Sequence, residues 1–400
     1  MSDIDILDAE LIKPTVFFDE NKLSADYIPD RLEFRSDQLR DIVHHFRGLF
    51  SLNGTTRELI ITGQIGTGKT SLAKKFGGWV QQKSDEYHTN IKFVHVNCRR
   101  NRTAYMILMA IARELNSHVP TRGYSADELM EMVVELLEGK SATLLLVLDE
   151  IDFAVNNGAE DLLYALTRTS DERRYVNHGI ALILIARSTA FLEKLDQSTR
   201  SSLLSATISL NPYSKEQLYT ILESRIHISF VDGSVSSESI DLAAEIASSR
   251  GDARQALELV WYAGKFADKE ASSIVYPEHV RLAKSNVDPS LLRNVVETLS
   301  LHKLLLLLGI ARQLRLTRSA NITTGDAKQA YSILCEEFGV SSRKHTQLWE
   351  YLKEFEKSDI IVLKLSGQGQ RGTTQLISLH DASTKELEVA VLKRIKISDK

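Results

Sequence analysis

A glycine-rich segment from Gly63 to Thr70, GQIGTGKT, has the residue types and spacing that bind phosphate groups. It matches the pattern G-x-x-x-x-G-K-T in full, and it follows an apolar run and precedes a helical stretch. Glycines let backbone N–H groups close around phosphate oxygens at the positive end of a helix. We expect Lys69 to reach the β- and γ-phosphates of a nucleotide and the Thr70 hydroxyl to ligate Mg²⁺. The predicted nucleotide-binding residues of this loop are Gly63, Gln64, Ile65, Gly66, Thr67, Gly68, Lys69 and Thr70.

A second segment, LLLVLDEID (144–152), is an apolar run that ends in carboxylates. In a sheet that also carries a phosphate loop, such a strand delivers its carboxylates to the place where the metal and the attacking water lie. We expect Asp149 to hold Mg²⁺, directly or through water, and Glu150 to polarise the nucleophilic water.

Short apolar runs alternate with helical stretches in the first half of the chain. Strands that are apolar throughout and are separated by helices indicate a parallel sheet covered by helices on both faces. The five predicted strands are residues 58–62, 91–96, 143–149, 180–186 and 206–210.

After residue 212 the predicted secondary structure changes twice along the chain. Residues 213–285 read as helices only, and the segment SNVDPS (285–290) has turn-forming residues that indicate a domain boundary. After it, three helical stretches precede two strand-like runs and a lysine-rich final helix, and three helices followed by two strands are the parts of a winged helix. These five elements are expected at roughly 300–316, 324–338, 342–357, 360–365 and 374–379.

Length and composition bound the class of protein. The chain has 400 residues, of which 43% are hydrophobic and 26% charged, so we expect a soluble protein of two or three domains. Its longest apolar run, Leu304 to Ile310, is too short to cross a membrane, and the acidic start MSDIDILDAE is unlike a secretory signal. Cys98 and Cys335 stand far apart, as isolated thiols do in a reducing cytoplasm. We therefore predict a cytoplasmic protein with no membrane partner.

Charge is distributed unevenly along the chain. Residues 291–400 hold 17 Lys and Arg against 12 Asp and Glu, a net charge of +5, whereas the whole chain carries −4. A basic C-terminal module on an acidic body indicates an anionic partner such as nucleic acid.

These motifs, in this order, resemble the archaeal origin-recognition and cell-division-control initiator family, AAA+ ATPases that bind replication origins and help load the replicative helicase. Other segments similar to the family are YIPDRLEFRSDQL (27–39), VPTRGYSADEL (119–129), GDARQAL (251–257) and TTGDAKQAY (323–331). The resemblance implies an α/β AAA+ core over 1–212, an all-α lid over 213–285 and a winged-helix DNA-binding domain over 291–400.

The resemblance also assigns residues around the nucleotide, ATP or ADP. Tyr27, Ile28 and Pro29 would line the adenine pocket, and Arg254 would be the lid arginine, called sensor 2, that reaches the phosphates. The family usually has a polar residue, typically Asn, at the end of the fourth strand, where this chain has Arg187. An arginine cannot accept a hydrogen bond from water, although it can contact a γ-phosphate, so we expect ATP binding with at most slow hydrolysis.

The arginine finger that a neighbouring protomer normally supplies is less well defined. Arg200 is the nearest candidate, and a plain surface arginine is an equally good interpretation of it. A second family feature is an insertion in the AAA+ domain that contacts DNA. Arg102 and Arg122 are the best-placed residues for that contact, and salt-bridged surface arginines are the alternative.

The helix expected at 342–357 has a core-facing stripe of Leu348, Leu352 and Phe355. A rotation of 100° per residue puts another set of side chains on the opposite face, as in a recognition helix in a major groove. Glu350, in that set, either reads a cytosine amine or marks a part of the face that misses the DNA. Phosphate or base contacts are expected from Arg343, Thr346, Gln347, Trp349 and Lys353.

The segment SGQGQRG, which includes Gln370 and Arg371, separates the last two predicted strands. Its glycines suit a tight hairpin tip. In the family this wing enters the adjacent minor groove, where the negative potential favours arginine.

The sequence is thus interpreted as a replication initiator in which the nucleotide state acts as a switch. Its expected partners are double-stranded origin DNA, the replicative helicase and other initiator paralogues, and its expected location is the nucleoid. Two alternatives share these parts. One is a branch-migration motor with fast, DNA-stimulated hydrolysis, and the other is an ATP-gated transcriptional regulator.

Overall fold

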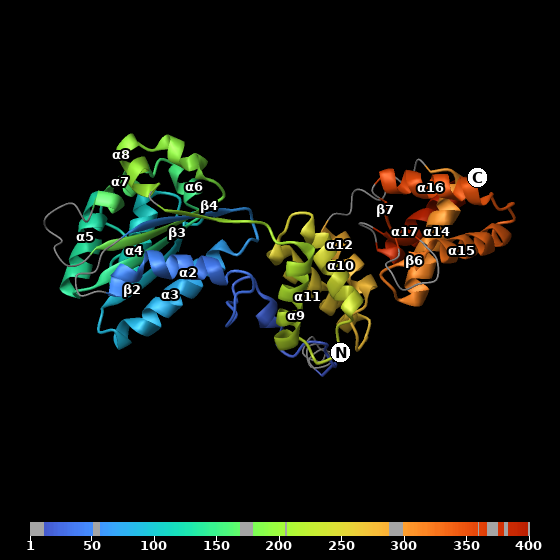
Figure 1. The fold of residues 1–400 in the computed structure, drawn as a ribbon, viewed down its shortest axis with the longest axis horizontal. Helices are drawn as coiled ribbons and strands as arrows, with labels where there is room; N and C mark the ends of the chain where they lie inside the picture. The colour runs from blue at the N-terminus through green and yellow to red at the C-terminus, as the bar shows by residue number, and fades with distance from the viewer. Residues whose placement is uncertain are drawn as a thin grey trace. The chain divides into compact units, whose positions relative to one another are not determined.

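A computed structural model of the chain describes residues 12–50, 57–168, 179–204, 206–287, 299–358, 360–365, 375–379 and 383–398 (Figure 1). Within these ranges the chain forms two compact units. The first contains residues 28–217 and 250–253, and the second contains residues up to Tyr27 together with 218–249 and 254–400. No helix in the described ranges is both long and apolar enough to cross a membrane.

The first unit is built on a five-stranded parallel sheet, as the apolar runs predict, with the strand order β2-β3-β4-β1-β5. Every residue of β3 and β4 is buried, which explains why these two strands are apolar along their whole length. The strands are β1 (Glu58–Gly63), β2 (Ile91–Asn97), β3 (Thr143–Asp149), β4 (Ile180–Ala186) and β5 (Thr207–Leu210).

Helices cover both faces of this sheet (Figure 1). Leu144, Leu146 and Leu148 of β3 pack with α4 (Ala104–Leu115) and α5 (Ala126–Gly139). The alternate residues Leu145 and Val147 pack with α2 (Ser36–His45) and α3 (Lys69–Glu86). Successive strand residues thus serve two separate cores. Shorter helices are η2 (Arg47–Phe50), α6 (Ile151–Val155), α7 (Glu160–Arg168), η3 (Thr189–Lys194) and α8 (Gln197–Leu203).

The second unit begins with a helical bundle, as predicted for 213–285. Its helices are α9 (Lys215–Ser229), α10 (Ser237–Ser248), α11 (Ala253–Lys269) and α12 (Pro277–Val287). A segment near the N-terminus, with η1 (Glu20–Leu23), packs on this bundle. The rings of Phe17 and Phe230 lie 4.6 Å apart, and the Val16 N–H donates to Asp268.

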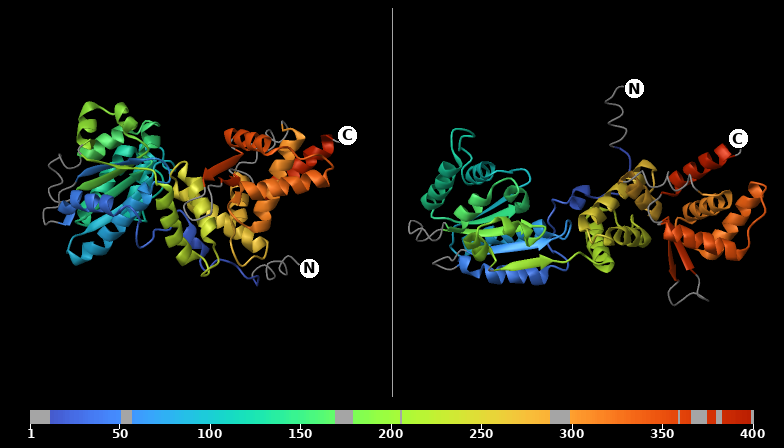
Figure 2. Two further views of the ribbon diagram at one scale, coloured as in Figure 1. Left: turned by 45° about the vertical axis from the view of Figure 1, so that its right-hand side comes forward. Right: turned by 90° about the horizontal axis from the view of Figure 1, so that it is seen from above.

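The C-terminal part has the helices and strands of a winged helix, with β7 and β8 running side by side (Figure 2). Its central helix α14 is buried along most of its length, which accounts for the unbroken apolar run in the sequence. A short strand β6, which the sequence did not predict, adds to an antiparallel sheet of order β6-β8-β7. The elements are α14 (Leu301–Thr317), β6 (Ile322–Thr323), α15 (Thr324–Glu337), α16 (His345–Lys357), β7 (Ile361–Leu365), β8 (Gln375–Leu379) and α17 (Thr384–Ser398).

Candidate nucleotide-binding site and nucleic-acid interface

The predicted phosphate loop connects the end of β1 to the start of α3. Gly66 and Gly68 have φ values of +76° and +89°, a region that side chains other than glycine rarely adopt. A Cβ atom at Gly66 would lie 1.7 Å from Oδ1 of Asp252, so only glycine fits against this carboxylate. Gly68 is the N-cap of α3, which leaves the N–H groups of the first turn at the loop. The glycines therefore adopt a backbone conformation that suits a phosphate loop.

Lys69 is the first residue of α3, and its side chain folds back over the loop. Its Nζ donates to the carbonyl oxygens of Gly63 and Gln64, each at 2.7 Å. Burial lowers the pKa of Lys69, while the nearby carboxylate of Asp149 opposes this shift. The lysine is thus held at the loop by neutral acceptors.

Asp149, at the end of β3, joins the loop to the sheet. Its Oδ2 accepts a hydrogen bond of 2.7 Å from Thr70 Oγ1, and Nε2 of His95 lies 3.2 Å from the same oxygen. Burial alone would raise the pKa of this carboxyl, but hydrogen bonds from His95 and Thr70 outweigh it and hold the pKa below its usual range. Asp149 is therefore an anion beside the phosphate loop.

These oxygens fit the magnesium ion that the loop implies. Mg²⁺ prefers hard oxygen ligands and is usually held by one or two protein groups together with phosphates and water. A hydroxyl and a carboxylate only 2.7 Å apart, Thr70 and Asp149, meet that description. In the described residues no cluster of three or more His, Cys, Asp and Glu side chains could hold a metal ion.

Glu150 follows the strand in a left-handed conformation, with φ of +56°, and is the N-cap of α6. Its Oε1 accepts a hydrogen bond of 3.4 Å from Nδ2 of Asn97, and Arg99 forms an ion pair with Oε2 at 3.9 Å. Asn97 is the residue of β2 directly opposite Asp149. The sheet edge thus supplies a donor that fixes the predicted water-polarising carboxylate.

Arg187 directly follows β4, two residues beyond Ile185, which pairs with Asp149 in the sheet register. Its side chain is exposed, and its guanidinium carbon lies 5.8 Å from the ring of Phe153. After burial, the main cause, the charge of Arg187 is among those that lower the pKa of Lys69. Arg200 lies exposed on α8, and the described residues show no contact between it and this site.

The residues predicted around the adenine divide between the two units. Tyr27 lies in the second unit, where its ring is flanked by Nζ of Lys22 at 4.4 Å and by the guanidinium of Arg225 at 4.7 Å. Ile28 and Pro29 begin the first unit, and the Pro29 carbonyl accepts from Lys75 Nζ on α3 at 2.9 Å. Arg254 belongs to the second unit, as an exposed residue in the first turn of α11.

Arg35 is a site residue that the sequence did not reveal. It is only 5% exposed, and its Nε and Nη2 donate to the Thr67 carbonyl at 3.1 and 2.9 Å. Its Nη2 also donates to Asn211, and its guanidinium lies 4.0 Å from the ring of Tyr213. Burial lowers the pKa of Arg35, and Tyr213 opposes this shift. Arg35 thus stabilises the phosphate loop through its backbone. No motif or spacing in the sequence connects this arginine with the loop.

His95 and Asn97 were also missed, but here a signal was present. Both side chains lie in β2, and residues two apart in a strand point to the same face. Polar residues at the carboxyl end of a strand next to the one that carries Asp149 could have been expected to contact it.

The predicted recognition helix is α16, and its core stripe is confirmed because Leu348, Leu352 and Phe355 are all buried. Lys353 is exposed, lies 5.2 Å from the ring of half-buried Trp349, and pairs with Glu356 at 2.9 Å. The other predicted contact residues on the exposed side of this helix are Thr346 and Gln347.

One helix boundary was wrong. The helix was expected from 342, but α16 begins at His345, so Arg343 precedes the helix and does not lie on its face. The Arg343 N–H donates to the hydroxyl of Tyr331 at 3.1 Å, which fixes the chain before the helix. Its side chain is exposed.

Two other predicted DNA contacts, Arg102 and Arg122, lie on loops. Arg102 and Arg122 are both exposed, and Arg102 Nε donates to the Arg99 carbonyl at 3.1 Å. Gln370 and Arg371, at the predicted wing tip, lie outside the described residues.

Comparison with known families agrees with this geometry. A sequence model of the Cdc6 AAA+ ATPase-type lid domain matches residues 219–285, and a model of the CDC6 C-terminal winged helix domain matches residues 294–389. A model of the AAA domain matches residues 53–195.

Individual relatives match over almost the whole chain. The chain is 33% identical to ORC1-type DNA replication protein 2 of Sulfurisphaera tokodaii, over 97% of this chain and 95% of the relative. Among solved structures it is similar to Cdc6p from Pyrobaculum aerophilum, with a TM-score of 0.80, 31% identity, and coverage of 96% and 100% of the two chains. The ORC1 protein of Aeropyrum pernix, solved in complex with DNA, has a TM-score of 0.64 and 29% identity, with coverage of 97% and 100%. The chain therefore belongs to the archaeal Cdc6 and ORC1-type family of DNA replication initiators, AAA+ ATPases with a C-terminal winged helix.

Proposed function

We propose that this protein binds ATP and duplex origin DNA and helps recruit or load the replicative helicase, with the nucleotide state acting as a switch. The observation that carries the proposal is the hydrogen bond between Thr70 and Asp149, which joins a complete phosphate loop to its carboxylate strand. Three domains over 1–212, 213–285 and 291–400 remain our preferred division, supported by the residues that the family models match.

When ATP binds, its phosphates would replace hydrogen bonds that are now formed within the loop. Lys69 Nζ donates to the carbonyls of Gly63 and Gln64, and phosphate oxygens would replace these acceptors. Thr70 and Asp149 would hold the magnesium ion, which supplies positive charge to the phosphates when bound. On the resemblance to the family, Tyr27, Ile28, Pro29 and Arg254 would complete the nucleotide site.

Slow hydrolysis fits this proposal better than a motor does. Glu150 can accept a hydrogen bond from a water molecule, because the contacts from Asn97 and Arg99 do not use all the lone pairs of its carboxylate. Arg187 has no lone pair to accept a hydrogen bond from that water, although it can stabilise a γ-phosphate. The arginine at this position therefore favours a long-lived ATP state, which is the property that a switch requires.

The DNA contact would be made by the winged helix. The exposed residues Thr346, Gln347 and Lys353 of α16 suit a major groove, and Arg343 suits a phosphate just before the helix. The net charge of +5 in residues 291–400 would make binding strongly dependent on salt. The complex of the Aeropyrum pernix ORC1 protein with DNA supports this proposal for a related chain. Arg102, Arg122 and Arg371 are further proposed contacts, and Arg200 is the proposed arginine finger.

Genomic footprinting with and without ATP tests the function. Protection of repeated sequences at a replication origin supports an initiator. Protection confined to promoters would instead indicate a transcriptional regulator. Fast ATP hydrolysis stimulated by duplex or branched DNA would indicate a branch-migration motor. The Lys69→Ala variant controls for binding that does not require nucleotide.

Recruitment is tested separately, with purified replicative helicase and paralogous initiators from the same organism. We expect pull-down of the helicase by the ATP-bound protein on origin DNA and a weaker signal with ADP. An equal signal in both nucleotide states would contradict the switch. A protein with this role would act at the nucleoid.

A further inference from the structure

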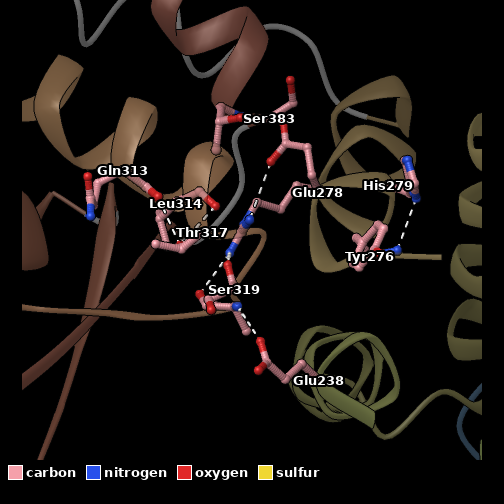
Figure 3. Close-up of polar contacts among 12 residues, drawn as sticks. Glu238, Tyr276, Glu278, His279, Gln313, Leu314, Thr317, Ser319 and Ser383 are labelled. Carbon is pink, nitrogen blue, oxygen red and sulfur yellow. Dashed lines mark hydrogen bonds and ion pairs between the residues drawn. The ribbon is translucent and has the colours of Figure 1, made fainter. Parts of the chain in front are cut away.

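A set of polar contacts joins the helical bundle to the winged helix within the second compact unit (Figure 3). The bundle contributes side chains from α10 and α12, and the winged helix contributes mostly backbone groups near the end of α14 and the start of α17. The bundle residues, which we call the clasp, are Glu238, Glu278 and Arg281.

Arg281 is the centre of the clasp. It is only 2% exposed, and its Nη2 donates to the carbonyls of Ala320 and Ser319 at 2.7 and 3.2 Å. These two residues follow α14, in the turn before β6. A buried guanidinium is costly unless its donors find acceptors, and here the winged helix supplies two of them. Separation of the two parts would leave these donors without these acceptors.

Glu278 binds both Arg281 and the winged helix. One carboxylate oxygen pairs with Arg281 Nη1 at 3.3 Å, and the other accepts from the backbone N–H of Thr384 at 2.9 Å. Thr384 is the first residue of α17, where backbone N–H groups lack partners within the helix and negative charge is favourable. Ser383 satisfies another N–H of this turn by accepting from Glu386. A helix of the winged domain is therefore capped in part by a residue of the bundle.

Other contacts near the clasp also join the bundle to the winged helix. Oε2 of Glu238, on α10, accepts a hydrogen bond of 2.8 Å from the Ala320 N–H. Ala320 lies in the turn that Arg281 also contacts. The guanidinium of Arg318 lies 4.8 Å from the ring of Tyr276, and Lys364 of β7 pairs with Glu245 of α10. The bundle thus holds three separate places on the winged helix, namely the turn after α14, the start of α17, and β7.

We propose that the clasp fixes the winged helix on α10 and α12, so that the bundle and the winged helix move as one rigid body. Contacts on three different elements of the winged helix restrict rotation as well as separation. The linking segment between α12 and α14 is not required for this restraint. If the proposed function is correct, a nucleotide that moves the lid would also reorient the recognition helix. That consequence rests on the proposed function, but the rigid body itself does not.

The first test measures a distance distribution in the full chain, without nucleotide or DNA. Spin labels at Asp232→Cys in the bundle and Ser358→Cys after α16 occupy exposed positions, whereas the native Cys98 and Cys335 are buried and should stay unlabelled. We expect a single narrow distribution, and Arg281→Met should broaden it. A broad distribution in the parent protein, or an equally narrow one in the variant, would overturn the proposal.

The second test uses amide hydrogen exchange and does not depend on Arg281→Met being folded. Glu278→Gln keeps an acceptor for the Thr384 N–H but removes the charge that faces Arg281, whereas Glu278→Ala removes both. We expect exchange of the Thr384 amide to accelerate roughly 10-fold in the alanine variant and less in the glutamine variant. Glu258→Gln, an exposed residue of α11, is the matched control and should change nothing. Unchanged exchange in Glu278→Ala would refute the capping contact.

Both tests are made without ligand, so they separate the clasp from the proposed function. Failure of the footprinting experiment with a narrow distance distribution would leave the rigid body intact. Origin protection with a broad distribution would leave the initiator role intact and remove the clasp.

Discussion

Thr70 Oγ1 donates a hydrogen bond of 2.7 Å to Asp149 Oδ2, across a separation of 79 residues in the sequence. The contact exists because β1 and β3 both end at the same edge of the parallel sheet, with β4 between them. Two motifs recognised independently in the sequence thus meet in one site. Open α/β sheets commonly bind ligands at this edge.

Magnesium should strengthen nucleotide binding through this pair. We expect Asp149→Asn and Thr70→Val each to reduce the stimulation of ATP binding by Mg²⁺, because each removes one hard oxygen ligand or its charge. Fluorescent ATP titrated with and without Mg²⁺ measures the effect. Thr199→Val, a buried threonine of α8 away from the loop, controls for general destabilisation. Equal magnesium dependence in the parent and in both site variants would contradict the assignment.

Lys69 should be required for nucleotide but not for duplex DNA. The Lys69 ammonium group now donates to the carbonyls of Gly63 and Gln64 and would donate to phosphate oxygens when ATP binds. Lys69→Ala removes this group, so we expect ATP binding to be lost. Duplex binding by the isolated protein should stay largely intact. Lys83→Ala, in an exposed ion pair on the same helix, is the control. Tight ATP binding by Lys69→Ala would refute the phosphate-loop assignment.

The sheet could be predicted because its strands are buried on both faces. Such strands must be apolar at every position, and β3 and β4 were predicted with the bounds that the structure has. The strand β6 has only two residues, too few to show any period, and was missed. The start of α16 was misplaced because the residues before it are polar, and its N-cap, Lys344, makes no side-chain capping bond.

The site residues also divide into those that the sequence could predict and those that it could not. The phosphate loop is a local motif of eight consecutive residues, so its conformation follows from its own glycines and the strand and helix around it. Arg35 contacts the loop only through the tertiary fold, and a buried arginine is not distinguishable from an exposed one in a sequence. The clasp residue Arg281 was missed for the same reason, since its acceptors are backbone carbonyls that carry no sequence signal.

Arg35 should support the phosphate loop from behind. Arg35→Met removes two hydrogen bonds to the Thr67 carbonyl, so we expect ATP affinity to fall roughly 10-fold. Arg35→Lys keeps the charge but loses the forked geometry and should rescue only part of this loss. Isothermal titration of ATP measures both variants. Arg40→Met, in an exposed ion pair with Asp37 on the same helix, should change the affinity little.

Low pH should destabilise the second unit because His279 becomes protonated. Burial lowers the pKa of this histidine below its usual value of 6.5, and the hydrogen bond with Glu270 opposes the shift. As pH falls below about 6.5, the unfolded chain takes up a proton before the folded one, so the free energy of unfolding decreases. The lower limit of this window is the depressed pKa of the folded state.

Denaturant unfolding at several pH values tests this effect. His279→Gln removes the titrating group and can still accept the Tyr276 N–H that now donates to Nδ1 at 3.0 Å, so it should flatten the decline below pH 6.5. His118→Gln, an exposed histidine, should keep the parent slope. A decline of the same size in His279→Gln would assign the acid sensitivity to other groups.

Winged-helix contacts should separate into those that give affinity and those that give sequence preference. Lys353→Ala and Arg371→Ala remove charges expected at DNA phosphates and in the minor groove, and the arginine change should cost roughly 1–3 kcal/mol of duplex binding. The lysine change should lower the dependence on salt by about one counterion, with little effect on sequence preference. Thr346→Val should instead alter preference among sites while leaving the salt dependence unchanged, because a base edge is read without a charge. Fluorescence anisotropy with origin and scrambled duplexes over a salt series measures all three. An affinity that none of the three changes would mean that this face of the winged helix does not touch DNA.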